Sequence, residues 1–129
     1  NKKKKSNFFN HYVLKHNSKL IGVGYGEKYS KSERSCLWGF YVDSKINSDI
    51  KYGSLIKYLL FEKLFKITEI SSIECQVKEG YEWIKNWHIK WGHKVKDHNK
   101  DLKCYNLILK KKTWKNIKKK IYETGFKKN

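Results

Sequence analysis

One strand–helix–strand unit in the first half of the chain constrains the fold more than any other feature. Residues 36–42 (CLWGFYV) form a continuous apolar run of strand length, which is typical of a central strand buried on both faces. Apolar residues then recur every three or four positions from Tyr52 to Leu64, as on one face of a helix. Residues 70–77 alternate again like a strand. This order predicts two parallel strands joined by a right-handed helical crossover.

Shorter predicted elements lie on both sides of this unit. Their short polar connections are typical of antiparallel hairpins, and Gly92 is predicted to end a second helix in a left-handed conformation. Together they predict an α/β chain of mixed (α+β) type, with a central mixed sheet flanked by helices. The further strands are expected at residues 8–14, 20–25, 93–96 and 104–109, the further helices at 81–91 and near 117–122, and polar connections at 27–33 and 97–101.

The composition indicates one folded domain over residues 1–129, with a basic lead at 1–7 and a Lys-rich tail at 110–129. Aromatic residues make up 16% of the chain, whereas disordered chains are poor in them. The formal net charge of +18 attracts polyanions, so a basic nucleic-acid-binding module is an alternative. Arg34 is the only arginine, however, and readers of nucleic acid usually carry several for bidentate contacts.

The cysteines and histidines do not predict a metal site. The cysteines are far apart and form no CxxC pair, and three histidines are spaced by five residues, whereas ligands on a helix prefer three or four. Buried free thiols are typical of a reducing compartment, so we expect a cytoplasmic protein. No apolar run of about 18 residues predicts a membrane span. The residues concerned are Cys36, Cys75, Cys104, His88, His93 and His98.

The start of the first predicted helix is a candidate anion site. Ser48 or Asp49 is expected to cap it, and the backbone N–H groups at a helix start point outward at the positive end of the helix dipole. Such an end suits a pyrophosphate. Gly53 permits close backbone approach, although a lone glycine at a helix start is more often structural. Neighbouring charge is expected from Lys45, Lys51 and Lys57.

Three segments carry a family resemblance: CLWGFYVD (36–43), DIKYGSLIKYLLFEKLF (49–65) and ECQVKEGYEWIKNWHIKWGHKV (74–95). They resemble the GNAT superfamily of N-acetyltransferases over about residues 8–112, and among subfamilies the amino-sugar N-acetyltransferases of pseudaminic-acid synthesis are most similar. The chain departs from the family pattern at Lys51, which stands where the first glycine of the pyrophosphate loop is usual. The first elements of the family's fold are expected to be missing.

The resemblance implies a splayed sheet in which the pantetheine arm of acetyl-CoA lies like an added strand. Backbone groups beside the opening would bind that arm, and the backbone N–H near Tyr41 would meet the developing oxyanion. The loop at the helix start would hold the pyrophosphate. The implied cofactor-binding residues are Phe40, Tyr41, Val42, Lys51, Tyr52, Gly53 and Ser54.

The resemblance also suggests candidates for proton transfer. Many family members have a tyrosine four residues before the conserved glycine of the second helix, and this chain has His88 there, whose imidazolium could protonate the departing thiolate. The alternative is that His88 packs in the apolar stripe of its helix. Tyr81 is a second candidate acid, for which packing is the alternative. Glu74 is a candidate base or water-positioning residue, or else an exposed strand carboxylate.

These features predict an acetyl-CoA-dependent N-acetyltransferase that acts on a primary amine of a small molecule by direct attack, without an acyl-enzyme. A nucleotide-linked amino sugar is one candidate acceptor. The alternatives are a basic nucleic-acid-binding module and a GNAT-like domain without activity. We expect acetyl-CoA and an amine as partners, no membrane and no metal, with a homodimer as an open alternative.

Overall fold

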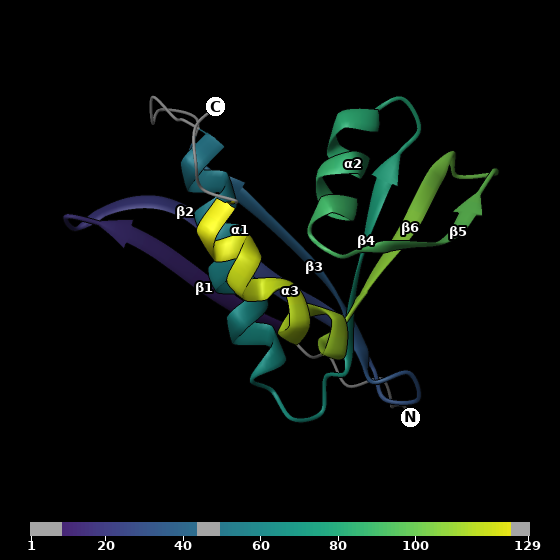
Figure 1. The fold of residues 1–129 in the computed structure, drawn as a ribbon, viewed down its shortest axis with the longest axis horizontal. Helices are drawn as coiled ribbons and strands as arrows, with labels where there is room; N and C mark the ends of the chain where they lie inside the picture. Colours follow the sequence, from purple (N-terminus) through teal and green to yellow (C-terminus); the bar gives the residue numbers. More distant parts are fainter. Residues whose placement is uncertain (1–8, 44–49, 125–129) are drawn as a thin grey trace.

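The computed structural model describes residues 9–43 and 50–124 (Figure 1). These residues form a six-stranded sheet in the order β1-β2-β3-β4-β6-β5, together with three helices. The strands are β1 (Phe9–His16), β2 (Lys19–Ser30), β3 (Ser35–Val42), β4 (Ser72–Lys78), β5 (Lys94–Asn99) and β6 (Cys104–Lys110). The helices are α1 (Ile50–Phe65), α2 (Glu82–Lys90) and α3 (Lys111–Thr124).

The sheet is mixed, as predicted. β3 and β4 are parallel and are connected through α1, whereas β1, β2 and β3 pair antiparallel on one side, and β4, β6 and β5 on the other. The connection through a helix explains why the central pair is parallel, because parallel neighbours need a long crossover while hairpins give antiparallel ones. The predicted order of strands and helices is therefore confirmed.

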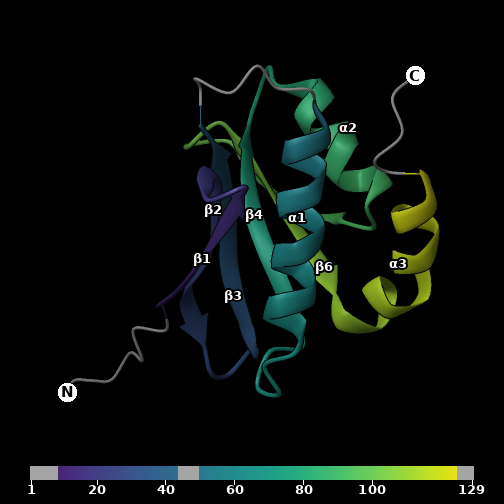
Figure 2. The ribbon, with the colours of Figure 1, turned by 90° about the vertical axis from the view of Figure 1, so that its left-hand side faces the viewer.

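All three helices lie on the same face of the sheet (Figure 2). The core forms between them, where Phe61 and Leu64 of α1 meet Ile73 of β4, Leu107 of β6 and Trp114 of α3, each at most 1% exposed. Burial of these large apolar side chains is the main favourable term in the fold. Among the helices of the described ranges, none combines the length and apolar character needed to cross a bilayer.

Two predicted polar connections are wrong in part. Residues 27–33 were expected to form a loop, but β2 continues to Ser30, where it pairs with Ser35 of β3. Residues 97–101 were expected to form a turn, but β5 continues to Asn99 and pairs with Cys104. In both cases a neighbouring strand supplies hydrogen bonds to a polar segment, and this context outweighs its low intrinsic strand preference.

The start of α3 differs from the prediction, whereas the end of α2 agrees with it. α3 begins at Lys111, earlier than the expected residues 117–122, because Trp114 and Ile121 are buried and extend its apolar face. Gly92 follows α2 with φ of 102°, which confirms the left-handed termination. The predicted caps Ser48 and Asp49 lie outside the described residues, as does Lys45.

Candidate functional site

β3 and β4 separate along most of their length. Their parallel register contains only three pairs, from Ser35 with Ser72 to Leu37 with Glu74, although both strands continue well beyond this point. Figure 1 shows the two strands diverging in a V, with α1 beside one arm and α2 beside the other. The backbone groups that face this gap therefore have no partner strand within residues 9–43 and 50–124, so an extended ligand could pair with them.

A cavity of about 470 Å³ occupies the gap, and we call it the gap cavity. Its lining includes four consecutive residues of β3, Leu37 to Phe40, and also Gln76 of β4 and Trp87 and His88 of α2. Successive residues of a strand point to opposite faces of the sheet. Because both sets of β3 residues line the cavity, it reaches through the sheet rather than lying on one face.

The backbone orientation of β3 decides which groups face the gap. Asp43 N–H donates to the carbonyl of Ile21 in β2 at 2.7 Å. In an antiparallel pair the direction of the backbone groups alternates along the strand. Tyr41, two residues away, therefore faces β2, while Phe40 and Val42 face the gap. The Tyr41 N–H is therefore directed into the β2–β3 ladder, and the backbone groups near Tyr41 that face the gap belong to Phe40 and Val42.

The start of α1 adjoins the gap cavity. α1 begins at Ile50, so Lys51, Tyr52, Gly53 and Ser54 lie in the helix, and the loop predicted there is its first turn. The first four N–H groups of a helix have no partner within it. A Cβ atom placed on Gly53 would lie 3.8 Å from Phe40 Cε2 and 3.9 Å from Trp87. The start of α1 therefore lies beside Phe40 and Trp87, which line the gap cavity.

Ser54 and Lys57 face the protein interior from α1. The side chain of Ser54 is 1% exposed, and its hydroxyl has no hydrogen-bond partner among the described residues. Lys57 is 0% exposed, and burial lowers the pKa of its amine well below the usual 10.5. Lys57 was expected to supply charge near the helix start; this is wrong, because the side chain lies on the apolar face of α1.

Aromatic rings enclose the Lys57 amine. Its Nζ lies 3.8 Å from the ring centroid of Trp87, 4.4 Å from that of Trp91 and 5.9 Å from those of Trp38 and Phe61. Sequence reasoning missed this group of residues. The available signal was the spacing of Lys57, Leu60, Phe61 and Leu64, which places the lysine on the buried face of the helix.

His88 and His93 are buried beside this aromatic group. Trp38 Nε1 donates to His93 Nε2 at 3.2 Å, so His93 carries its proton on Nδ1, which donates to the carbonyl of His88 at 3.1 Å. Burial and the nearby Lys57 lower the pKa of His88 to about 2 and that of His93 to about 3. Both rings are therefore neutral at pH 7, and the predicted imidazolium role of His88 does not fit its surroundings.

Glu74 lies where the strands separate. Its carboxylate accepts hydrogen bonds from Ser35 Oγ at 3.1 Å and from Lys96 Nζ at 3.2 Å, and its side chain is 14% exposed. Glu74 is thus a mostly buried, hydrogen-bonded carboxylate. The alternative prediction of an exposed strand carboxylate does not describe it. Tyr81 precedes α2 and is 51% exposed, and it is not part of the gap-cavity lining.

Cys36 of β3 and Cys75 of β4 are both buried. Burial raises the pKa of both thiols to about 12. A thiol with such a pKa is protonated at neutral pH, and the thiol is a much weaker nucleophile than the thiolate. Cys75 lines the gap cavity but is therefore unsuited to form an acyl-enzyme.

Sequence comparison gives no family: the chain matches no protein-family profile and no curated protein at a significant level. Solved structures do match. The N-acetyltransferase PseH of Campylobacter jejuni aligns with a TM-score of 0.65 and 14% identity, covering 80% of this chain and 68% of PseH. A mutant of the spermidine N-acetyltransferase SpeG of Vibrio cholerae gives 0.73 and 12%, covering 88% and 72%.

An aminoglycoside acetyltransferase, AAC(6')-Ib in complex with coenzyme A and kanamycin, aligns with a TM-score of 0.69 and 11% identity, covering 85% of this chain and 71% of its own. The chain has the GNAT fold. The predicted mixed, splayed architecture is thereby confirmed. These neighbours are an N-acetyltransferase, a spermidine N-acetyltransferase and an aminoglycoside acetyltransferase, all with similarly low identity, so the match supports the superfamily's fold and not the pseudaminic-acid subfamily.

Proposed function

We propose that this protein transfers an acetyl group from acetyl-CoA to a primary amine of a small molecule. The observation that carries the proposal is the separation of β3 and β4 after Leu37 and Glu74, with a cavity that reaches through the sheet. The proposal is supported by three GNAT-fold neighbours that are acetyltransferases, one of them in complex with coenzyme A.

The residues around the gap fit coenzyme A. Backbone groups of Phe40 and Val42 face the gap and can pair with the amides of an extended pantetheine arm, as with an added strand. The N–H groups in the first turn of α1 suit the diphosphate, with Gly53 allowing close approach. When bound, acetyl-CoA supplies the acetyl thioester.

Glu74 is our candidate for handling the acceptor's proton. An ammonium has no lone pair, so it must lose a proton before it can attack a carbonyl carbon. The Glu74 carboxylate lies at the point where the gap closes and can hold the ammonium and take its proton, directly or through water. The high pKa values of Cys36 and Cys75 favour direct attack by the amine over an acyl-enzyme.

His88 would act in its neutral form. It lines the gap cavity, its Nδ1 atom is buried without a hydrogen-bond partner among the described residues, and its ring packs against Trp38 and Trp87. We propose that it positions the thioester and does not serve as an imidazolium acid. Tyr81 remains a weaker candidate acid because its side chain is largely exposed.

The acceptor proposed first is an amino sugar, including a nucleotide-linked one, on the strength of the segment resemblance. The test combines two measurements: calorimetric titration with acetyl-CoA, and mass-spectrometric detection of acetylated products from a panel of amino sugars, alkylamines and peptide N-termini. We expect binding and one acetylated class. Failure to bind acetyl-CoA would refute the proposal, and binding without any product would identify an inactive GNAT-like domain.

A further inference from the structure

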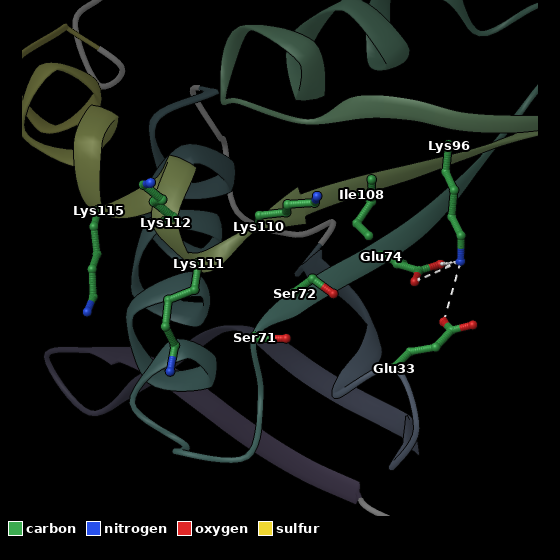
Figure 3. A pocket seen from close by; sticks show the side chains of 10 residues that line it. All are labelled: Glu33, Ser71, Ser72, Glu74, Lys96, Ile108, Lys110, Lys111, Lys112 and Lys115. Atoms are coloured by element: carbon green, nitrogen blue, oxygen red, sulfur yellow. Dashed lines mark hydrogen bonds and ion pairs between the residues drawn. The ribbon is translucent and has the colours of Figure 1, made fainter.

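A second cavity of about 680 Å³ lies next to Glu74, and we call it the lysine cavity. Ser72 and Glu74 of β4 and Ile108 and Lys110 of β6 line it, and these residues form two adjacent cross-strand pairs on one face of the sheet (Figure 3). Cys75 and Gln76, which follow Glu74 directly, line the gap cavity. Glu74 therefore lies at the boundary between the two cavities.

The charges of the lysine cavity do not balance. Lys96 pairs with Glu74 at 3.2 Å and with Glu33 at 3.5 Å, and these are the acidic residues of the lining. Four further lysines line it, and none has an ion-pair partner among residues 9–43 and 50–124. These four are Lys110, Lys111, Lys112 and Lys115. An anion would be attracted to this end of the cavity and a cation repelled.

The lysines crowd one another at the start of α3. Partial burial and the neighbouring charges of Lys115 and Arg34 lower the pKa of Lys111. In Figure 3 Lys110 extends along the cavity toward the Glu74–Lys96 pair, and Lys111 lies to the left of Ser71. Ser72 adds a hydroxyl group to the lining, whereas the Ser71 hydroxyl donates to the carbonyl of Arg34 at 3.3 Å. Positive charge and a hydroxyl donor together suit a phosphate or carboxylate.

We propose that the lysine cavity binds an anionic group of the acceptor while the acceptor's amine lies at Glu74. This inference rests on the proposed acetyl transfer. The spacing follows from the strand: Ser72 and its partner Lys110 are two residues from Glu74 and Ile108, which corresponds to about 7 Å. The acceptor class is thus an amine that carries a phosphate or carboxylate about 7 Å from its nitrogen, and polyamines are excluded.

A chain-matched set of acceptors tests this class. The probes are 6-aminohexanoate, 6-aminohexanol and 1,6-diaminohexane, which share one primary amine and differ in the charge at the far end. We expect kcat/KM to fall in that order, with the anionic probe favoured over the neutral one by about tenfold, as two partly exposed ion pairs would give. Equal rates for the three probes, or preference for the diamine, would overturn the proposal.

A double variant locates the effect. Lys110→Gln with Lys111→Gln should abolish the preference for 6-aminohexanoate over 6-aminohexanol. The control is Lys19→Gln with Lys90→Gln, which removes the same charge from two exposed sites outside both cavities. If both double variants reduce the preference for 6-aminohexanoate equally, the preference comes from the net positive charge of the whole protein, and the site proposal fails.

A binding measurement separates this inference from the proposed enzyme activity. Inorganic phosphate and 6-aminohexanoate are titrated while the amide resonances of Ser71 and Ser72 are followed in the wild type and both double variants. Shifts that vanish only in Lys110→Gln/Lys111→Gln support the site even if no amine is acetylated, in which case the transferase proposal alone fails. Absence of shifts in the wild type, or binding there of a single-stranded oligonucleotide but of neither small anion, refutes the site.

Discussion

The Nζ atom of Lys57 lies 3.8 Å from the centroid of the Trp87 ring, inside the protein and without a hydrogen-bond partner among the described residues. Contact with the ring face stabilises an ammonium by about 2 kcal/mol when water is excluded. Removing an ammonium from water costs several kcal/mol. Desolvation therefore exceeds the attraction of the rings, which is why the pKa of Lys57 is lowered.

We predict that Lys57→Met stabilises the protein at pH 7 by on the order of 1–4 kcal/mol, because methionine fills the aromatic enclosure without a buried polar atom. The unfolded chain binds a proton at this lysine that the folded one binds weakly, so wild-type stability should rise with pH toward 10.5 and the advantage of the variant should shrink. Urea denaturation between pH 7 and 10 measures both effects. Exposed Lys63→Met is the control, and a destabilised Lys57→Met would contradict the argument.

The buried histidines should make the protein sensitive to acid. The folded pKa values of about 2 for His88 and about 3 for His93 lie below the usual 6.5, so the unfolded chain binds more protons between these limits. Each histidine should therefore reduce the free energy of unfolding by about 1.4 kcal/mol per pH unit as the pH falls below 6.5. Denaturation at pH 7, 6 and 5 measures this slope. His93→Asn should lower it, whereas His16→Asn, at the exposed end of β1, should not.

Gly53 offers a test of the diphosphate site that does not depend on turnover. A Cβ atom has ordinary contacts of 3.8 and 3.9 Å there, so Gly53→Ala should fold and gain about 0.5–1 kcal/mol, since glycine is a poor helix former. Gly53→Glu places bulk and negative charge at the helix start and should weaken acetyl-CoA binding at least about tenfold. Calorimetry on both variants is the measurement. Equal affinity in wild type and Gly53→Glu would place the diphosphate elsewhere.

Glu74→Gln should lower kcat by about 100-fold or more, because the amide keeps the shape of the side chain but cannot accept a proton. The matched control is Glu33→Gln, since Glu33 also pairs with Lys96 but is 59% exposed. We expect Glu33→Gln to keep wild-type kcat. Steady-state rates with the best amine found are the readout, and similar rates for the two variants would remove Glu74 from the chemistry.

His88→Ala should lower kcat about tenfold or more and change acetyl-CoA affinity by no more than about threefold, because a positioning contact to the reacting group is lost. The dependence of wild-type kcat on pH distinguishes the two roles considered for this residue. A neutral His88 adds no step near pH 6.5. Such a step, present in the wild type and absent from the variant, would restore the imidazolium acid.

The element order could be predicted from the sequence because its signals are local. The apolar run of β3 and the three- and four-residue spacing in α1 depend on neighbours along the chain, and these elements appear where expected. The junction between them also predicted a candidate site, since the end of a parallel strand and the next helix start meet at one edge of the sheet. The extension of β2 to Ser30 could not be predicted, because a pairing strand, and not the segment itself, stabilises it.

The residue sequence by itself thus determined the mixed sheet and its parallel central pair, and it predicted a candidate site between β3 and α1. Only the tertiary structure decided that these strands separate after Leu37, that Phe40 and not Tyr41 faces the gap, and that Lys57 and His88 are buried. The physical reason is that hydrogen-bond partners and desolvation depend on residues distant in the chain. The protonation state of a side chain in particular depends on its burial and on neighbouring charges, and these are not known from the residue type alone.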